Sequence, residues 1–147
     1  MGDGETIHGT CVAIGAAGIL IIGPSGSGKS DLALRLIDEG AALVADDRTV
    51  LSRSGDRIMA RSPEALAGKI EIRGLGIVSR PYEVEAVLCG VIDLTGHQTV
   101  DRIPLPENRD ISGVSLPVLR IDPFQPSAPA RVRLFAAISS SDADILS

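Results

Sequence analysis

The residues whose chemistry is easiest to recognise form one short run, G-P-S-G-S-G-K-S at residues 23–30. The run matches G-x-x-x-x-G-K-S, in which backbone N–H groups surround phosphates, the lysine contacts the outer phosphates and the serine hydroxyl binds magnesium. Glycines allow consecutive N–H groups to turn toward one anion. The motif therefore predicts a binding site for a nucleoside triphosphate or a similar ligand, formed by Gly23, Ser25, Gly26, Ser27, Gly28, Lys29 and Ser30.

The segments on either side of this run fit the prediction. Residues 19–22 are an apolar run typical of a buried strand, and residues 31–39 carry apolar side chains at helical spacing before Gly40. A helix N-terminus adds unpaired N–H groups and the positive end of its dipole to a phosphate site. The alternative is a glycine-rich turn with an incidental lysine. It is disfavoured because motif and context agree, and because Lys69 is the chain's only other lysine.

A second group that can do chemistry is the pair Asp46 and Asp47, which follows a short apolar segment at residues 41–45. Strand, helix and strand form a βαβ unit, and the carboxyl ends of its parallel strands lie at one edge of the sheet. We therefore expect both carboxylates beside Lys29. One can bind magnesium next to Ser30, and the other can accept a proton from an attacking group. The structural alternative is that one of them caps a turn or pairs with Arg48.

The remaining candidates are weaker when taken alone. Glu71 and Arg73 alternate with isoleucines, so on a strand they would share one face, and a solvated sheet face explains them equally well. A single histidine such as His8 is more often structural than catalytic. Arg102 alone indicates nothing.

The elements that must position these residues can be predicted along the chain. A strand at residues 7–13 and the strand at 19–22 should form a hairpin through a reversal at 15–18, which places His8 at the same end of the sheet as the phosphate site. The other expected elements are a hairpin of strands at 49–53 and 57–61, a short helix from Pro63 to Gly68 capped by Ser62, strands at 70–73, 83–94 and 114–121, a mobile loop at 95–112, a proline-rich link at 123–129 and a terminal helix at 131–140.

The composition limits the function classes. A chain of 147 residues with 44% hydrophobic residues is long enough for one packed domain. A net charge of −5 and 2% aromatic residues disfavour a nucleic-acid-binding surface. No apolar run is long enough for a membrane span, and the N-terminus lacks the pattern of a signal peptide. Cys11 and Cys89 are isolated, which favours buried reduced thiols and a cytoplasmic protein over a disulfide or a zinc site.

Four stretches of the chain resemble the HPr kinase/phosphorylase family in order and approximate spacing, and the likeness covers about residues 6–101. They are H-G at 8–9, the glycine-rich run at 23–30, V-A-D-D at 44–47 and I-E-I-R-G-L-G-I at 70–77. The last resembles a signature segment that ordinary phosphate-loop proteins lack. The resemblance implies an α/β fold, a P-loop-containing mixed sheet with flanking helices that is similar to phosphoenolpyruvate carboxykinase. It also implies a single P-loop catalytic domain over residues 1–147, as in a short form without the N-terminal regulatory domain.

The resemblance also implies an activity and roles. The family uses ATP and magnesium to phosphorylate a serine of the phosphocarrier protein HPr, and many members reverse this with inorganic phosphate and release pyrophosphate. By position, Asp46 matches the acid/base residue, and the implied metal positions are Ser30, Asp47 and Glu71. His8 matches a supporting active-site position, and Arg102 resembles a loop arginine associated with dephosphorylation. Members are commonly homo-oligomers, usually hexamers, and neither nucleic acid nor membrane is an implied partner.

The chain departs from this family beyond residue 114. Where the family usually carries P-G-R-N before a long helix, this chain has L-P-V-L-R-I-D-P at residues 116–123 and room for only a short helix. Hexamer formation and the phosphorylase direction are therefore less well supported than the kinase direction. An ATP-sensing regulatory module without phosphoryl transfer is an alternative. A small-metabolite kinase is disfavoured because the segment around Arg102 is short and lacks clustered arginines. The sequence does not distinguish ATP from pyrophosphate as the donor.

Overall fold

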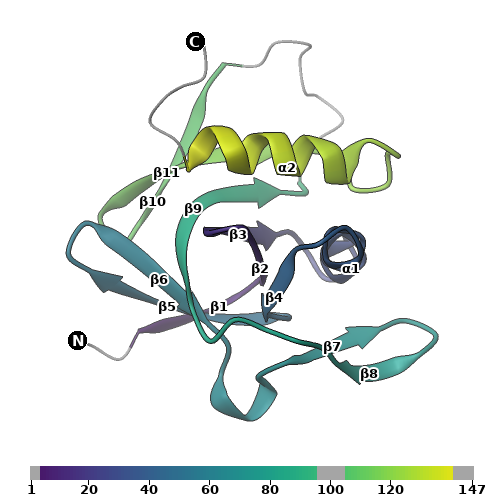
Figure 1. Ribbon diagram of the computed structural model, residues 1–147. Coiled ribbons are helices and arrows are strands. Elements are labelled where there is room, and N and C mark those ends of the chain that lie inside the picture. The colour runs from purple at the N-terminus through teal and green to yellow at the C-terminus, as the bar shows by residue number, and fades with distance from the viewer. Residues whose placement is uncertain (1–3, 96–104, 141–147) are drawn as a thin grey trace.

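The computed structural model describes residues 4–95 and 105–140. In these residues one large sheet, one small sheet and two α-helices make up the molecule (Figure 1). The elements in chain order are β1 (Glu5–His8), β2 (Thr10–Ile14), β3 (Ala17–Ile22), α1 (Lys29–Asp38), β4 (Ala42–Ala45), β5 (Arg48–Ser54), β6 (Arg57–Arg61), the 3-10 helix η1 (Glu64–Leu66), β7 (Lys69–Ile72), β8 (Gly76–Ser79), β9 (Ala86–Asp93), β10 (Glu107–Ile111), β11 (Val114–Arg120) and α2 (Ala128–Ser139).

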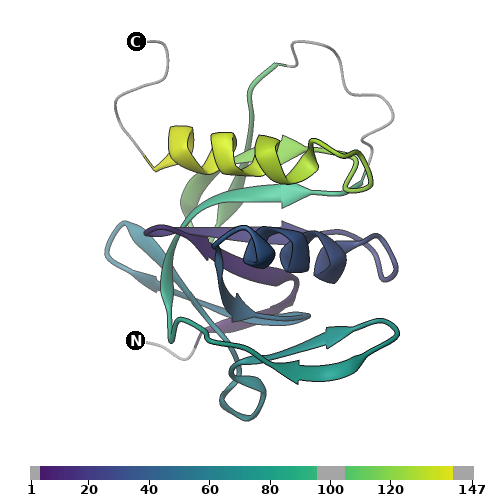
Figure 2. The ribbon, with the colours of Figure 1, turned by 45° about the vertical axis from the view of Figure 1, so that its right-hand side comes forward.

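The large sheet is mixed and curled, and β9 is its central strand. Strands pair in the order β1-β5-β6-β9-β3-β2-β4, and β11 joins parallel to β9 while pairing antiparallel with β10. β3 and β9 are parallel, with Ile22 opposite Asp93, so both strands end at the same edge. Figure 2 shows this edge on its right-hand side, where the loop before α1 and the arrowhead of β9 lie close together. Strands β7 and β8 form the separate two-stranded sheet.

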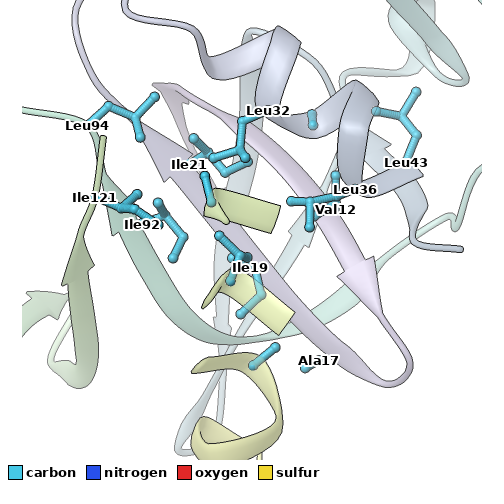
Figure 3. Close-up of a cluster of buried hydrophobic side chains, with 14 of the residues drawn as sticks. Val12, Ala17, Ile19, Ile21, Leu32, Leu36, Leu43, Ile92, Leu94 and Ile121 are labelled. Atoms are coloured by element: carbon cyan, nitrogen blue, oxygen red, sulfur yellow. The ribbon is translucent and has the colours of Figure 1, made fainter. Parts of the chain in front are cut away.

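The core divides into two clusters because successive side chains of a strand point to opposite faces. Ile19 and Ile21 of β3 contact the helix side, where Leu32 and Leu36 of α1 are fully buried (Figure 3). Leu20 points the other way, into a second cluster enclosed by the curled sheet. Burial of each such side chain contributes about 1.5–3 kcal/mol to folding. Both faces of β3 are therefore packed in the core, and this well-packed strand leads directly into the glycine-rich run.

Several predictions of local structure are confirmed. The β2–β3 hairpin exists, with Thr10 opposite Ile21, and the predicted hairpin of β5 and β6 forms around Gly55. β3, α1 and β4 follow one another as expected, and β3 and β4 run in the same direction because both are antiparallel to β2. The two are not adjacent, since β2 lies between them. The α/β class with a mixed sheet and flanking helices is therefore correct.

Other predictions of local structure are wrong. The strand expected at 7–13 is two strands, because the chain turns at Gly9 so that β1 pairs with β5 and β2 with β3. A side chain at Gly9 would lie 3.1 Å from the Ile21 carbonyl oxygen. The reversal uses only Gly15 and Ala16, since Ala17 already pairs with Ile14. The helix expected after Pro63 is only the 3-10 helix η1, and it has no side-chain cap.

The region after β9 also differs from expectation. The loop predicted at 95–112 contains β10 in its described part, and β10 pairs along its whole length with β11. Strand β8 was not predicted, and α2 begins at Ala128, so that Pro129 lies in its first turn rather than in a link. Proline is tolerated there because the first helical N–H groups have no intrahelical acceptor. Neither α-helix of residues 4–95 and 105–140 is long and apolar enough to cross a membrane.

Candidate functional site

The glycine-rich run forms a loop between β3 and α1. β3 ends at Ile22 and α1 begins at Lys29, with Gly28 as its N-cap in the left-handed conformation (φ 102°, ψ 17°). Gly26 also has positive φ, and a Cβ atom there would meet nothing within 4 Å. No side chain caps the first N–H groups of α1. The first N–H groups of α1 are therefore not bonded to a side chain, so they can donate to an anion bound at the helix N-terminus.

Two polar side chains of the loop have unusual environments. The Lys29 ammonium donates hydrogen bonds to the carbonyl oxygens of Gly23 (2.9 Å) and Pro24 (3.1 Å), so its charge lies at the loop. The Ser27 hydroxyl is buried and has no hydrogen-bond partner. An unsatisfied buried hydroxyl costs about 1–3 kcal/mol, and such groups in native proteins often mark a missing ligand or water. The loop thus presents a cation and an unused hydroxyl at one place.

Asp46 joins this loop to the rest of the site. Its side chain is only 9% exposed, and both carboxylate oxygens accept hydrogen bonds. Oδ1 accepts from the hydroxyls of Ser30 (2.7 Å) and Thr10 (3.2 Å), and Oδ2 accepts from the backbone N–H of Glu71 (3.0 Å). The hydrogen bonds to Asp46 therefore bring together α1, β2 and β7, which are far apart in sequence.

Asp47 has the opposite environment. Its side chain is exposed and its backbone is in the left-handed region (φ 67°), which is uncommon for a residue with a side chain. The Arg48 N–H donates to the Asp46 carbonyl oxygen (2.7 Å), which closes a three-residue turn around Asp47. The N–H of Asp47 donates to the Thr10 hydroxyl, and its carbonyl oxygen accepts from the Gly9 N–H. The fold holds this strained turn from both sides.

The other predicted residues are placed less fully. His8 ends β1 opposite Arg48, with an exposed side chain, one residue before the Gly9 that bonds to Asp47. Glu71 reaches the site through its backbone, while its side chain is exposed. Arg102 lies outside the described residues. Within residues 4–95 and 105–140, no three His, Cys, Asp or Glu side chains form a cluster that could hold a metal.

Comparison with known proteins decides the family. The family model described as "HPr Serine kinase C-terminal domain" matches residues 1–132. The chain belongs to this HPr kinase family. A protein of Clostridium tetani named HPr kinase/phosphorylase is 38% identical over 146 residues, covering 91% of this chain and 47% of that protein. A namesake from Halalkalibacterium halodurans is 38% identical over 130 residues, covering 76% of this chain and 42% of that protein.

A solved structure shares the fold of this HPr kinase family member. The HPr(Ser) kinase/phosphatase of Coxiella burnetii superimposes with a TM-score of 0.80 at 25% identity, over 90% of this chain and 94% of that one. By contrast, the chain spans less than half the length of the two curated relatives. The resemblance identified from the four sequence stretches is therefore confirmed at the level of the family.

Sequence reasoning missed residues of this HPr kinase family member that lie at the same edge. Thr10 is fully buried and its hydroxyl binds both Asp46 and Asp47, but a threonine inside a strand carries no distinctive signal. Asp93 ends β9 beside the end of β3, and Arg120 of β11 pairs with it at 3.2 Å. Asp93 could have been found by the reasoning that located Asp46, because it too follows an apolar strand.

The two cysteines take no part in this site. Burial raises the pKa of Cys11 to about 12 and also raises the pKa of Cys89. Both thiols are free and would stay protonated near neutral pH. Protonated thiols are poor nucleophiles and poor metal ligands, so chemistry at this site depends on oxygen and nitrogen groups.

Proposed function

We propose that this chain is an ATP- and magnesium-dependent protein-serine kinase and phosphorylase that acts on the phosphocarrier protein HPr. The 2.7 Å hydrogen bond from Ser30 to Asp46 supports the proposal best. It joins a glycine-rich loop suited to phosphates to a carboxylate pair suited to metal and proton chemistry. Family membership supplies the substrate class, since curated relatives are named HPr kinase/phosphorylase.

The residues at this edge fit a nucleotide and magnesium. Magnesium prefers oxygen ligands and is usually bound by one or two carboxylates together with substrate phosphates. The Ser30 hydroxyl donates its hydrogen bond to Asp46, which leaves its oxygen lone pairs available to a cation. Bound magnesium would neutralise charge that develops on the phosphates. Lys29 and the orphaned Ser27 hydroxyl would contact phosphate oxygens in the loop.

The geometry favours roles for Asp46 and Asp47 that are the reverse of those implied by the resemblance. Asp46 is buried and uses both oxygens for hydrogen bonds, which suits a residue that fixes Ser30 and the metal side of the site. Asp47 is exposed on a strained turn, which suits a residue that faces an incoming serine hydroxyl. We therefore propose that Asp47 acts as acid and base and that Asp46 is the magnesium-linked carboxylate.

One carboxylate, that of Asp47, can carry the serine proton in both directions of the proposed reaction. In the forward direction the serine oxygen forms a bond to the γ-phosphorus, the bond to the β-bridging oxygen breaks, ADP leaves and Asp47 takes the serine proton. In the reverse direction a phosphate oxygen attacks phosphoserine, the bond between the serine oxygen and phosphorus breaks, and protonated Asp47 returns the proton to the serine oxygen. Pyrophosphate is then the product.

The supporting roles of His8, Glu71 and Arg102 are part of the same proposal. The N–H of Gly9, next to His8, bonds to Asp47, and the N–H of Glu71 bonds to Asp46. The exposed side chains of His8 and Glu71 therefore remain available to substrate. Arg102 would serve the dephosphorylation direction. We further propose that the chain works as a homo-oligomer, as the family resemblance implies.

The deciding experiment incubates the purified chain with magnesium, labelled ATP and HPr from the same organism. We expect acid-stable label on a serine of HPr, and loss of this label in Lys29→Ala. Asp47→Asn should lower kcat about 10²–10⁴-fold at every magnesium concentration, as expected for loss of a general base. Asp46→Asn should instead raise the magnesium concentration needed for half-maximal rate. Adding phosphate to labelled HPr should release pyrophosphate.

Asp38→Asn is the matched control, because Asp38 is an exposed aspartate at the end of α1 away from the loop, and it should leave the rate unchanged. ATP binding without transfer to HPr would favour the ATP-sensing module instead. If Asp47→Asn kept a normal kcat while Asp46→Asn lowered it at saturating magnesium, Asp46 would be the acid and base, as the family resemblance implies.

A further inference from the structure

An exposed aromatic side chain lies against the glycine-rich loop. The chain has three aromatic residues, Tyr82, Phe124 and Phe135. Phe135 packs against Gly90 and the core, and the Tyr82 ring packs against Gly68. Phe124 is 66% exposed, and its ring atoms lie 3.1 and 3.3 Å from the position of a Cβ atom at Gly28. Most of the Phe124 side chain is therefore open to solvent, directly beside the N-cap residue of α1.

The segment that carries Phe124 is held in place by several contacts. The Phe124 N–H donates to the Asp122 side chain (2.9 Å), and the Gln125 N–H donates to the Asp122 carbonyl oxygen (3.3 Å). The Arg35 guanidinium on α1 donates to the Pro123 carbonyl oxygen. The ring is therefore anchored to the same helix that begins at the glycine-rich loop.

The position of this ring relative to the carboxylates follows from the order of the strands. β3 leads into the loop, and its two neighbours are β9 on one side and β2 on the other. β4, which leads to Asp46, lies beyond β2, whereas β11, which leads to Phe124, lies beyond β9. In Figure 2 the segment between β11 and α2 is above the loop end of α1, and β7 and β8 are below it. Phe124 and Asp46 thus lie on opposite sides of the loop.

We propose that Phe124 is the stacking residue for the base of the bound nucleotide. The inference rests on the proposed function, in which the phosphates occupy the loop. The transferred phosphate must point toward Asp46 and Asp47, so the nucleoside must leave the loop on another side. Phe124 offers an aromatic face on the side opposite to the carboxylates. Gly28 is required next to it because any side chain there would meet the ring and Pro123 (3.2 Å).

The type of contact predicts the specificity. Stacking uses the π-face that every base has, so it gives affinity with little base discrimination. We therefore expect ATP and GTP to bind within a few-fold of each other, unless other groups discriminate between them. A ligand without a base, such as inorganic tripolyphosphate, should gain nothing from Phe124.

The test uses the full chain and compares ATP with tripolyphosphate by isothermal titration. Phe124→Ala should weaken ATP binding roughly 5- to 150-fold, the range found when a base-stacking aromatic is replaced by alanine. It should leave tripolyphosphate binding unchanged. Phe124→Trp should restore ATP affinity and introduce the only tryptophan of the chain, whose fluorescence ATP should quench and tripolyphosphate should not. Leu134→Ala, an equally exposed apolar residue on α2, is the control and should change neither affinity.

Each other outcome overturns the inference in a recognisable way. Equal loss for ATP and tripolyphosphate in Phe124→Ala would mean that Phe124 only shapes the loop. Unchanged ATP affinity with a raised KM for HPr would assign the ring to the protein substrate. If the wild type bound neither ATP nor tripolyphosphate, the proposed function would fail together with this inference. Wild-type ATP binding that Phe124→Ala did not change would remove this inference alone.

Discussion

At the scale of single residues, the two adjacent aspartates show how one turn can give neighbouring side chains opposite environments. Asp46 is buried with three hydrogen bonds, and Asp47 is exposed in a conformation that glycine adopts more easily. Strained residues of this kind persist where the surrounding structure holds them and are common at functional sites. Thr10 and Gly9 hold Asp47 here.

This strain predicts that Asp47→Gly stabilises the fold while removing phosphoryl transfer. Glycine relieves the left-handed conformation, and we expect a gain of about 0.5–1 kcal/mol in the free energy of unfolding. Urea denaturation of the wild type and the variant measures it. Asp47→Ala is the matched control, because it removes the same carboxylate and keeps the strain. A glycine variant no more stable than the alanine variant would contradict this explanation.

At the scale of elements, Arg120 connects the ends of three strands near the glycine-rich loop. Its guanidinium pairs with Asp93 at the end of β9, forms two hydrogen bonds with Glu107 of β10, and donates to the Thr95 carbonyl oxygen. The hydrogen bond with Glu107 raises the pKa of Arg120. Asp93 is only 5% exposed, and its carboxylate contacts Arg120 and accepts hydrogen bonds from Thr95.

We predict that Arg120→Met destabilises the fold by about 1–3 kcal/mol, because it leaves the buried Asp93 carboxylate without a cation. The expected cost is below that of a fully buried pair, since the Arg120 side chain is 35% exposed. Urea denaturation measures the loss. The double variant with Asp93→Asn should cost less than the sum of the two single changes.

Arg133 provides the matched comparison for Arg120. Its pair with Glu39 joins α2 to the end of α1, and both side chains are more than two-fifths exposed. Arg133→Met should therefore change stability by less than about 0.5 kcal/mol. Equal effects of the two arginine variants would show that burial of Asp93 does not determine the strength of its pair.

At the scale of the whole molecule, the helix layer and the curled sheet meet where α2 lies across β9. Val132 and Ala136 of α2 are buried in the same cluster as Ile19 of β3 and Ile92 of β9. Gly90 lies under the Phe135 ring, with a Cβ position only 2.6 Å from the nearest ring atom. The absence of a side chain at Gly90 therefore sets how closely α2 approaches the sheet.

Gly90→Ala should lower the free energy of unfolding by about 1–3 kcal/mol, because the added methyl group overpacks the contact with Phe135. Adding Phe135→Leu should recover part of this loss, as measured by urea denaturation. Gly18→Ala is the control, because its methyl group would meet the Val87 carbonyl oxygen at 2.8 Å, which no change at Phe135 can relieve. Recovery of both glycine variants by Phe135→Leu would argue against the steric cause.

The sequence by itself determined the local parts of the candidate site. The strand, glycine-rich loop and helix around Lys29 follow from neighbours in the chain, and the placement of Asp46 at the same edge follows from the direction of two strands. Such features depend on periodicity, glycine positions and chain direction, which are written in short stretches of sequence. For the same reason the family could be identified from four short motifs.

Only the tertiary structure decided which distant residues meet. The break at Gly9, the pairing of β10 with β11 and the bonds of Thr10 to both aspartates depend on partners 36 or more residues away or on strands whose sequences carry weak signals. The opposite exposure of Asp46 and Asp47, and the contact of Phe124 with Gly28, likewise arise when separate elements pack together. Local sequence encodes the conformation of each element, whereas the partner of a side chain is fixed by the packing of the complete fold.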